Sequence, residues 1–215
     1  MIRLHYYPSN ASLAPHMLLE ELAVPFELVL VDRTKNEHKS ADYLRLNPNG
    51  VIPVLVDGDL VLYESAAICL HLVDTHPEAQ LAPQVGSRER AHFYKWLIWS
   101  TNTFQAMLLH YFYGERMVDP GDARAAAKVK AQAEARIASM LDQLDDALGS
   151  HGTDWLLGAR LSAVDFFVLM LCRWTRGFAR PARSLPHLGP YLERVLARPT
   201  VQRAFSTEKL PQPWV

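Results

Sequence analysis

The chain has 215 residues, 49% of them hydrophobic, and a formal net charge of −1 at pH 7. This hydrophobic content supports a folded core, and the near-neutral charge excludes the basic surface that nucleic-acid binding needs. No apolar run reaches the roughly 18 residues of a membrane span, so we expect no membrane partner. The two cysteines, Cys69 and Cys172, lie in apolar helical contexts without a CxxC pair. We therefore predict reduced thiols and a cytoplasmic location.

The N-terminal part alternates strand and helix patterns. Residues 2–7 alternate apolar and polar side chains, which predicts a strand. A helix is expected after Ser12, its N-cap, with Pro15 in the first turn, where a missing N–H costs little. A second strand is expected over 26–31, followed by a polar loop or short helix over 32–42.

The next stretch predicts a hairpin and a helix. Apolar runs at 54–56 and 60–62 flank an Asp-Gly-Asp sequence, which is hairpin turn chemistry. A small apolar helix over 66–73 follows. The order β-α-β-(loop or α)-β-β-α is thioredoxin-like and predicts an α/β first domain.

No convincing strand appears in the rest of the chain. Proline and glycine punctuate the segment before Arg88, which indicates a linker at 81–87. We therefore predict a thioredoxin-like domain over 1–80 and an all-helical domain over 88–215. The helices expected there span 88–113, 125–148 with Gly149 ending it, Ser162 to about Arg176, and 188–197 with Pro199 after it.

One helix start is marked strongly. Ser162 and Asp165 have the Ser-x-x-Asp spacing of a capping box, and Leu161 and Phe166 are placed for the hydrophobic staple that accompanies it. We assign Ser162 and Asp165 to stability, not to chemistry.

The residues from Ile52 to Ser65 suit a small anionic peptide. Pro53 opens a strand, and a cis Ile52–Pro53 bond would leave the N–H and C=O of Ile52 free to pair with an extended peptide. Ser65, at a helix N-terminus, offers a hydroxyl, free amides and a positive dipole end to a carboxylate.

The pattern NPNGVIPVL…LYESAAI resembles the glutathione site of the cytosolic glutathione transferases, and the likeness covers essentially the whole chain. In that family the residue before the cis-proline pairs with the cysteinyl backbone, and a Glu-Ser pair holds the γ-glutamyl end. The resemblance implies a glutathione co-substrate bound by Ile52, Pro53, Glu64 and Ser65, with a backbone role for Val51. It also implies a homodimer.

A charged segment extends this resemblance. Asn36-Glu37-His38-Lys39 is similar to the Gly-Glu-His-Lys sequence of the theta class, whose histidine and lysine reach the glycyl carboxylate. His38 and Lys39 are therefore expected at the glycine end of the site. The alternative is a solvated charged loop.

The loop after the first strand should activate the thiol. Its pattern, YxP…SLAxHxxLxE, resembles the bacterial beta class, but Ala11 stands where that class has a catalytic cysteine. The catalytic serine of the delta and theta classes falls on Asn10, and the nu-class threonine falls on Ser9. Ser12, Asn10 and Ser9 can all donate to a thiolate, and we rank them in that order because Ser12 lies at the helix N-terminus. Ser12 could instead be a plain N-cap.

The resemblance places a second-substrate pocket between the two domains. Gln105 stands where beta-class enzymes have a histidine. Arg176 or Arg180 could enter the cleft and bind an anionic substrate or a glutathione carboxylate, or these arginines could form a solvated basic face. The other expected lining residues are Leu108, Tyr111, Phe112 and Trp174.

Three functions stay open. The leading one is conjugation of the glutathione thiolate to a small hydrophobic electrophile. The first alternative is a glutathione-dependent disulfide reductase, favoured by the missing cysteine. The second is a non-catalytic protein that binds glutathione or hydrophobic ligands. The nine histidines show no metal-ligand spacing, so no metal is expected.

Overall fold

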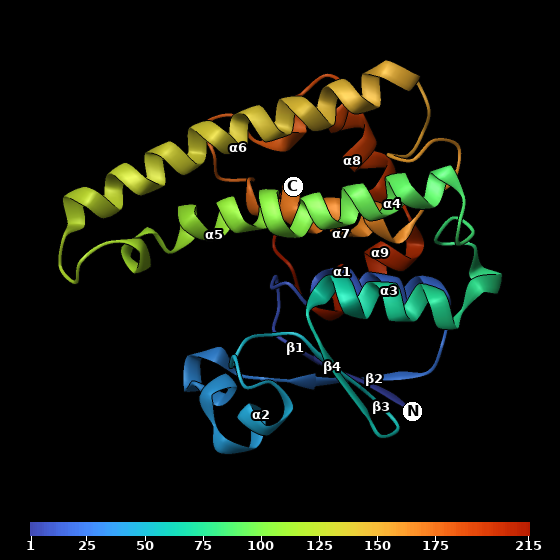
Figure 1. Ribbon diagram of the computed structural model, residues 1–215, viewed down its shortest axis with the longest axis horizontal. Helices are drawn as coiled ribbons and strands as arrows, with labels where there is room; N and C mark the ends of the chain where they lie inside the picture. Colours follow the sequence, from blue (N-terminus) through green and yellow to red (C-terminus); the bar gives the residue numbers. More distant parts are fainter.

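The computed structural model describes residues 1–215 and contains one four-stranded sheet beneath a group of helices (Figure 1). The strand order is β2-β1-β3-β4, with β1 parallel to β2 and antiparallel to β3, and with β3 antiparallel to β4. The predicted hairpin is present, since Asp57 pairs with Leu60 across a two-residue turn. The strands are β1 (Ile2–Tyr6), β2 (Phe26–Leu30), β3 (Val54–Asp57) and β4 (Leu60–Tyr63).

Helices cover both faces of the sheet. They are α1 (Leu13–Leu22), α2 (Ala41–Leu46) and α3 (Ser65–Thr75). Alternation along β3 divides the core, because neighbouring strand residues point to opposite faces. Leu55 belongs to the large core cluster that contains residues of α1 and α3, whereas Val54 and Val56 pack with Tyr43 of α2. The thioredoxin-like prediction for this part is confirmed. The segment 32–42, where a loop or short helix was expected, contains 3-10 turns at Arg33–Lys35 and Glu37–Lys39 and the first residues of α2.

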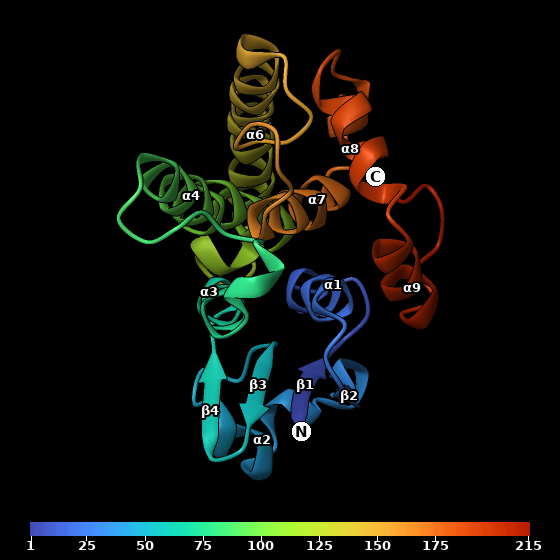
Figure 2. The ribbon, with the colours of Figure 1, turned by 90° about the vertical axis from the view of Figure 1, so that its right-hand side faces the viewer.

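The second half of the chain is helical. Its helices are α4 (Arg88–Trp99), α5 (Ala106–Phe112), α6 (Ala123–His151), α7 (Ala163–Trp174), α8 (Leu188–Leu196) and α9 (Pro199–Thr207). Both ribbon views place α7 between α1 and the outer helices (Figures 1 and 2), and every residue from Ala163 to Arg173 is buried. Helix α7 is therefore the central buried helix, and it packs between the first half of the chain and the outer helices of the second. No helix is both long enough and apolar enough to cross a membrane.

The helix expected over 88–113 is present without a break to Phe112, and a π-helical turn at Ser100–Gln105 lies between α4 and α5. Two other helix predictions are corrected. Helix α6 does not end at Gly149 but continues to His151, where Gly152 takes a left-handed φ of 58°. Pro199 does not close the last helix; it begins α9, since a proline at the first helical position loses no hydrogen bond.

The predicted capping box starts α7. The Asp165 carboxylate accepts from the Ser162 backbone N–H at 2.7 Å and from its hydroxyl at 3.0 Å. The same carboxylate also accepts from the Leu156 N–H at 3.1 Å and from the Tyr191 hydroxyl at 2.7 Å. Asp165 is fully buried. Its carboxylate therefore links the start of α7, the loop at Leu156 and helix α8 in the interior of the protein.

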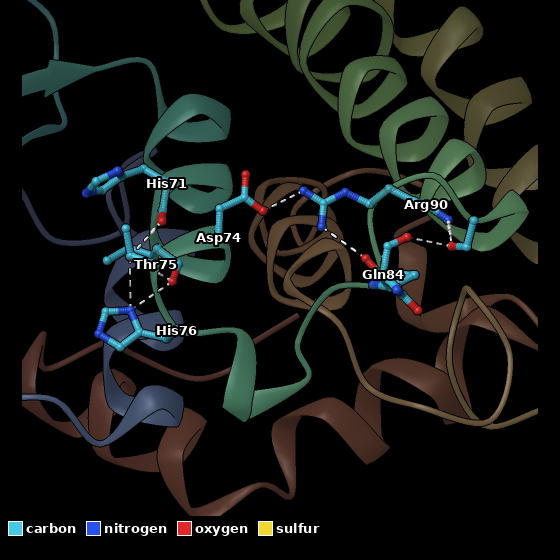
Figure 3. A network of polar contacts seen from close by, with 9 residues as sticks. His71, Asp74, Thr75, His76, Gln84 and Arg90 are labelled. Atoms are coloured by element: carbon cyan, nitrogen blue, oxygen red, sulfur yellow. Dashed lines mark hydrogen bonds and ion pairs between the residues drawn. The ribbon is translucent and has the colours of Figure 1, made fainter.

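The connection between the halves is held by polar contacts (Figure 3). Arg90 of α4 pairs with Asp74 near the end of α3 at 2.6 Å and donates to the Pro83 carbonyl at 3.0 Å. Thr75 and His76, which close α3, bond back to carbonyls of that helix. The strands all precede Ser65 and only helices follow Ser87, which supports the proposed division at 81–87.

Candidate functional site

A cavity of about 530 Å³ opens where the two halves meet. Every predicted site residue lines it except Ser12, Leu108 and Tyr111, and of the two alternatives Arg176 and Arg180 only Arg176 does. The first half supplies the segment after β1, the 3-10 turns before α2, the loop before β3 and the start of α3. The second half supplies α5, the turn after it and the end of α7.

The loop before β3 exposes peptide groups to the cavity. The Ile52–Pro53 bond is cis, and neither the N–H nor the C=O of Ile52 has a hydrogen-bond partner within the protein. The preceding carbonyl, of Val51, is held by the Tyr43 hydroxyl at 2.9 Å and by the Asn47 amide at 2.8 Å. A loop braced on one side and unpaired on the other suits an extended peptide.

The start of α3 forms the next wall. Glu64 adopts φ 73°, ψ 113°, a conformation that a non-glycine residue occupies at a cost and that is concentrated at functional sites. No side chain caps α3, so its first amides remain available to an anion. The expected role of the Ser65 hydroxyl needs correction, because that hydroxyl already donates to the Ala11 carbonyl at 2.9 Å. The first amides of α3, and not the proton of this hydroxyl, remain without a partner within the protein.

His38 and Lys39 lie close to the same loop. Lys39 Nζ donates to the Asn49 carbonyl at 3.3 Å, and His38 Nδ1 is buried without a partner. Burial, together with Arg33 and Lys39, lowers the pKa of His38 below its ordinary value of 6.5. Gly50 permits this approach, because a Cβ there would meet Lys39 Nζ at 2.7 Å and the His38 carbonyl at 2.9 Å. His38 is thus half-buried against this loop, while Lys39 is exposed.

The thiol-activating candidates differ in position. Ser12, ranked first, is fully buried and outside the cavity. Its hydroxyl donates to the Tyr7 carbonyl at 3.2 Å and accepts from the Tyr7 N–H at 3.3 Å, and it makes no N-cap bond to α1. The ranking is therefore corrected, because this hydroxyl shapes the loop and cannot reach a ligand.

Ser9 and Asn10 do line the cavity. The Ser9 hydroxyl oxygen accepts from Arg173 Nε at 3.4 Å, which leaves the hydroxyl proton free to donate. Asn10 uses its Oδ1 to accept from the Ala11 N–H at 2.6 Å, which leaves its amide nitrogen as a donor. Both residues retain a donor, as stabilisation of a thiolate requires.

Helical phase decides which residues of the second half reach the cavity. Gln105, Leu109 and Phe112 line it at steps of four and three, the spacing of one helix face. Leu108 and Tyr111 were predicted to line the pocket and do not. Leu108 is fully buried, and Tyr111 packs against Phe178 at 4.2 Å between ring centroids. The error has a simple cause, since one helical face packs in the core while the neighbouring face lines the cavity.

Besides Leu109, three cavity residues were not predicted from the sequence: Arg33, Tyr113 and Arg116. Arg33 donates to the Tyr113 hydroxyl at 3.2 Å across the two halves, and the Arg116 guanidinium lies 4.0 Å from the Tyr113 ring centroid. No local pattern marks these residues, because only the tertiary fold brings the segments together.

Trp174 and Arg176 line the cavity as expected, and Trp174 Nε1 is buried without a partner. Arg180 does not line it and pairs with Asp142 at 2.7 Å.

Comparison with known proteins decides the family. The chain matches the model of the glutathione S-transferase N-terminal domain over residues 1–74 and that of the C-terminal domain over residues 109–207. It is 30% identical to a glutathione S-transferase, GstA, of Escherichia coli O157:H7, over 97% of this chain and 100% of that one. The chain belongs to the glutathione S-transferase family. The family, the fold and the assignment as a glutathione transferase, all predicted from the sequence, are confirmed.

Solved structures of glutathione transferases agree with this. A sphingomonad glutathione S-transferase in complex with glutathione is 29% identical, with a TM-score of 0.83 over 97% of this chain and 100% of that one. The beta-class glutathione S-transferase of Sphingomonas chungbukensis is 28% identical, with the same TM-score and coverage.

A second hollow, of about 910 Å³, lies beside the linker of this transferase chain. Several of its polar groups are paired within the protein: Arg90 with Asp74, Arg160 with Gln80 at 2.7 Å, and Ser162 with the capping-box carboxylate. The smaller cavity, by contrast, combines the unpaired peptide groups of Ile52 with most of the predicted site residues. No group of three or more histidine, cysteine, aspartate or glutamate side chains is placed to hold a metal ion.

Proposed function

We propose that this protein conjugates glutathione to an electrophilic small molecule in the cavity between its two halves. The observation that carries the proposal is the pair of unpartnered peptide groups of Ile52, which lie beside the uncapped start of α3. A γ-linked tripeptide with a central cysteinyl unit and two terminal carboxylates matches this arrangement. When bound, glutathione supplies the nucleophilic sulfur.

Each wall has a distinct part in binding. Ile52, braced by Val51 and ended by Pro53, pairs with the cysteinyl backbone through its N–H and C=O. The amides of Ser65 and the start of α3 bind the γ-glutamyl carboxylate. Glu64 offsets the ammonium group of the γ-glutamyl end.

The glycyl end of glutathione binds at the side of the site that carries His38 and Lys39. The His38 imidazole and Lys39 Nζ bind the glycyl carboxylate, since both side chains line the cavity beside the same loop. Such charge-assisted hydrogen bonds are roughly twice as strong as neutral ones.

Ser9 and Asn10 act on the thiol. Each donates a hydrogen bond toward the sulfur and so favours the thiolate, and the Arg173 cation behind Ser9 polarises its hydroxyl. Gln105, Phe112, Trp174 and Arg176 form the wall that receives the second substrate.

Disulfide reduction is the second candidate. It is supported by Ala11, which occupies the place of the beta-class catalytic cysteine, and by the exposure of Ser9 to the cavity. Comparing turnover of 1-chloro-2,4-dinitrobenzene with turnover of 2-hydroxyethyl disulfide, both with glutathione, separates the two reactions. Binding without turnover of either compound would favour the non-catalytic alternative.

The binding test is calorimetric titration with glutathione. We expect a micromolar to low-millimolar Kd for the protein, weakened by roughly tenfold or more in Glu64→Ala, because a charged hydrogen bond contributes about 1.5–3 kcal/mol. Glu78→Ala is the matched control, since Glu78 is exposed and outside the cavity. Absence of binding to the unmodified protein would refute the proposal.

We further propose a cytoplasmic homodimer. Exposed apolar side chains support the dimer: Leu60 and Val61 on β4, and Tyr94 and Ile98 on α4, the last 56% exposed. Figure 2 shows β4, α3 and α4 following one another along one side of the molecule. Sedimentation of Ile98→Glu should give a monomer if this side is the interface. The free, buried Cys69 and Cys172 support a reducing compartment.

A further inference from the structure

The cavity carries an excess of unpaired positive charge. Its lining includes Arg33, Lys39, Arg116 and Arg176, and its only carboxylate is that of Glu64. None of these four cations forms an ion pair with a carboxylate within the protein. The chain as a whole has a net charge of −1, so the excess of positive over negative side chains in this lining is a local property of the cavity.

Neighbouring groups hold these guanidinium groups in place. The Tyr113 hydroxyl accepts from Arg33 at 3.2 Å, while the Tyr113 ring lies beneath Arg116, with 4.0 Å from the guanidinium carbon to the ring centroid. Arg176 donates to the Arg173 carbonyl at 3.0 Å. Cations held this way lose less side-chain entropy on binding an anion than cations on free surface side chains.

Glutathione does not account for all of this charge. On the proposed function, on which this inference rests, Lys39 and His38 take the glycyl carboxylate and the start of α3 takes the γ-glutamyl carboxylate. Arg33, Arg116 and Arg176 then remain in the lining of the same cavity as the aromatic side chains of Phe112 and Trp174, the wall proposed to receive the second substrate.

We propose that the second substrate carries a carboxylate next to its reactive apolar group. The carboxylate meets the guanidinium groups of Arg33, Arg116 and Arg176, and the apolar part packs on Phe112 and Trp174. The carboxylate belongs either to an organic electrophile that carries one or to the glutathionyl half of a glutathione mixed disulfide, and the test separates these sources. With the disulfide, the thiolate of the bound glutathione forms a bond to the glutathionyl sulfur, the original sulfur–sulfur bond breaks, and the other half leaves as its thiolate. With an aryl chloride, a carbon–sulfur bond forms, chloride leaves with its bonding pair, and the thiol proton passes to solvent.

Two matched aryl chlorides provide the test: 4-chloro-3-nitrobenzoate, which is anionic, and 1-chloro-2,4-dinitrobenzene, which is neutral. For each, kcat/KM is divided by the uncatalysed rate constant with glutathione, because the two differ in intrinsic reactivity. This gives a rate enhancement for each aryl chloride. We expect the enhancement for the anionic compound to exceed that for the neutral one. The ratio of the two enhancements should fall by roughly tenfold in Arg116→Gln and in Arg176→Gln. The ratio should also fall as salt rises. Arg180→Gln is the control, because Arg180 lies outside the cavity and pairs with Asp142.

A binding measurement keeps the test decisive if turnover is slow. The two glutathione conjugates that these reactions form are titrated calorimetrically into the protein and the three variants. Tighter binding of the carboxylate conjugate, weakened in Arg116→Gln and Arg176→Gln but not in Arg180→Gln, supports the inference. Equal binding of both conjugates, or equal losses in all variants, overturns it while leaving the transferase proposal intact.

Two further outcomes have distinct meanings. One identifies which kind of substrate carries the carboxylate, and the other refutes the proposed transferase function. Arginine-dependent reduction of the mixed disulfide of glutathione and 2-mercaptoethanol, with no turnover of either aryl chloride, supports the carboxylate site and assigns it to a disulfide substrate. Failure to bind glutathione and both conjugates refutes the proposed function and this inference together.

Discussion

The carboxylate of Glu208 accepts a hydrogen bond from the backbone N–H of Ser9 at 2.8 Å, joining two residues 199 positions apart. Its other oxygen lies 2.8 Å from His16 Nδ1, and both side chains are fully buried. Arg173, also buried, approaches Ser9 from the same side, and burial beside Arg176 lowers the pKa of its guanidinium to about 10. The segment after α9 therefore positions the loop that faces the thiol.

Glu208→Ala tests this support. The change leaves the Ser9 N–H and His16 Nδ1 buried without partners, so we expect the free energy of unfolding to fall by about 3 kcal/mol. We also expect a lower kcat/KM, because Ser9 would shift. Urea unfolding monitors stability, and the exposed Glu193→Ala is the control, with a change within about 0.5 kcal/mol. Equal stability of the two variants would contradict the positioning role.

The apparent pKa of bound glutathione distinguishes the loop residues. Ser9→Ala and Asn10→Ala each remove a donor that faces the cavity, so the thiol pKa should rise in both. Ser12→Ala should destabilise the protein without moving that pKa, because its hydroxyl bonds only to the Tyr7 backbone. Ultraviolet absorbance of the thiolate, followed against pH in each complex, measures the shift. A pKa rise confined to Ser12→Ala would restore the order expected from the sequence.

His38 should link ligand binding to proton uptake. Burial and the neighbouring cations lower its pKa below 6.5 in the free protein, so the native state binds fewer protons there than the unfolded chain. The stability contributed by His38 is thus present above pH 6.5 and is lost as pH falls through its lowered folded-state pKa. A carboxylate bound beside His38 reverses the shift and favours protonation.

S-methylglutathione isolates this effect, because it has no thiol proton to release. Titrations below pH 6.5 in buffers of different ionisation enthalpy should show proton uptake that disappears in His38→Asn. The exposed His92→Asn should retain the uptake. Uptake that persists in His38→Asn would place the glycyl carboxylate elsewhere.

The capping box predicts a stability difference between two helix starts. Asp165→Ala removes four hydrogen bonds in the interior, and we expect a loss of about 3–5 kcal/mol in the free energy of unfolding. Asp122→Ala removes one exposed N-cap bond, from the Ala125 N–H at the start of α6, and should cost about 1 kcal/mol. Glutathione affinity should not change in either variant that remains folded. Similar losses in the two variants would show that the box is no more than a local cap.

Much of this protein is determined by local sequence. Period-2 alternation marks β1, and the Asp-Gly-Asp turn marks the hairpin, because these signals depend only on neighbouring residues. The spacing of Ser162 and Asp165 predicts the start of α7 for the same reason. The segments around Ile52 and Ser65 likewise carry their own signals, a proline that opens a strand and a polar residue that opens a helix.

Tertiary structure alone decided which residues face the cavity. Ser12 has the chemistry of a thiol donor, yet the fold turns its hydroxyl into the loop. Leu108 and Leu109 are adjacent and identical in type, and only the packing of α5 sends one into the core and the other to the cavity. Arg33 and Tyr113 meet because residues 80 positions apart are brought together by the docking of the two halves. Local patterns specify elements, whereas a binding surface depends on how distant elements pack, and that information is spread over the whole chain.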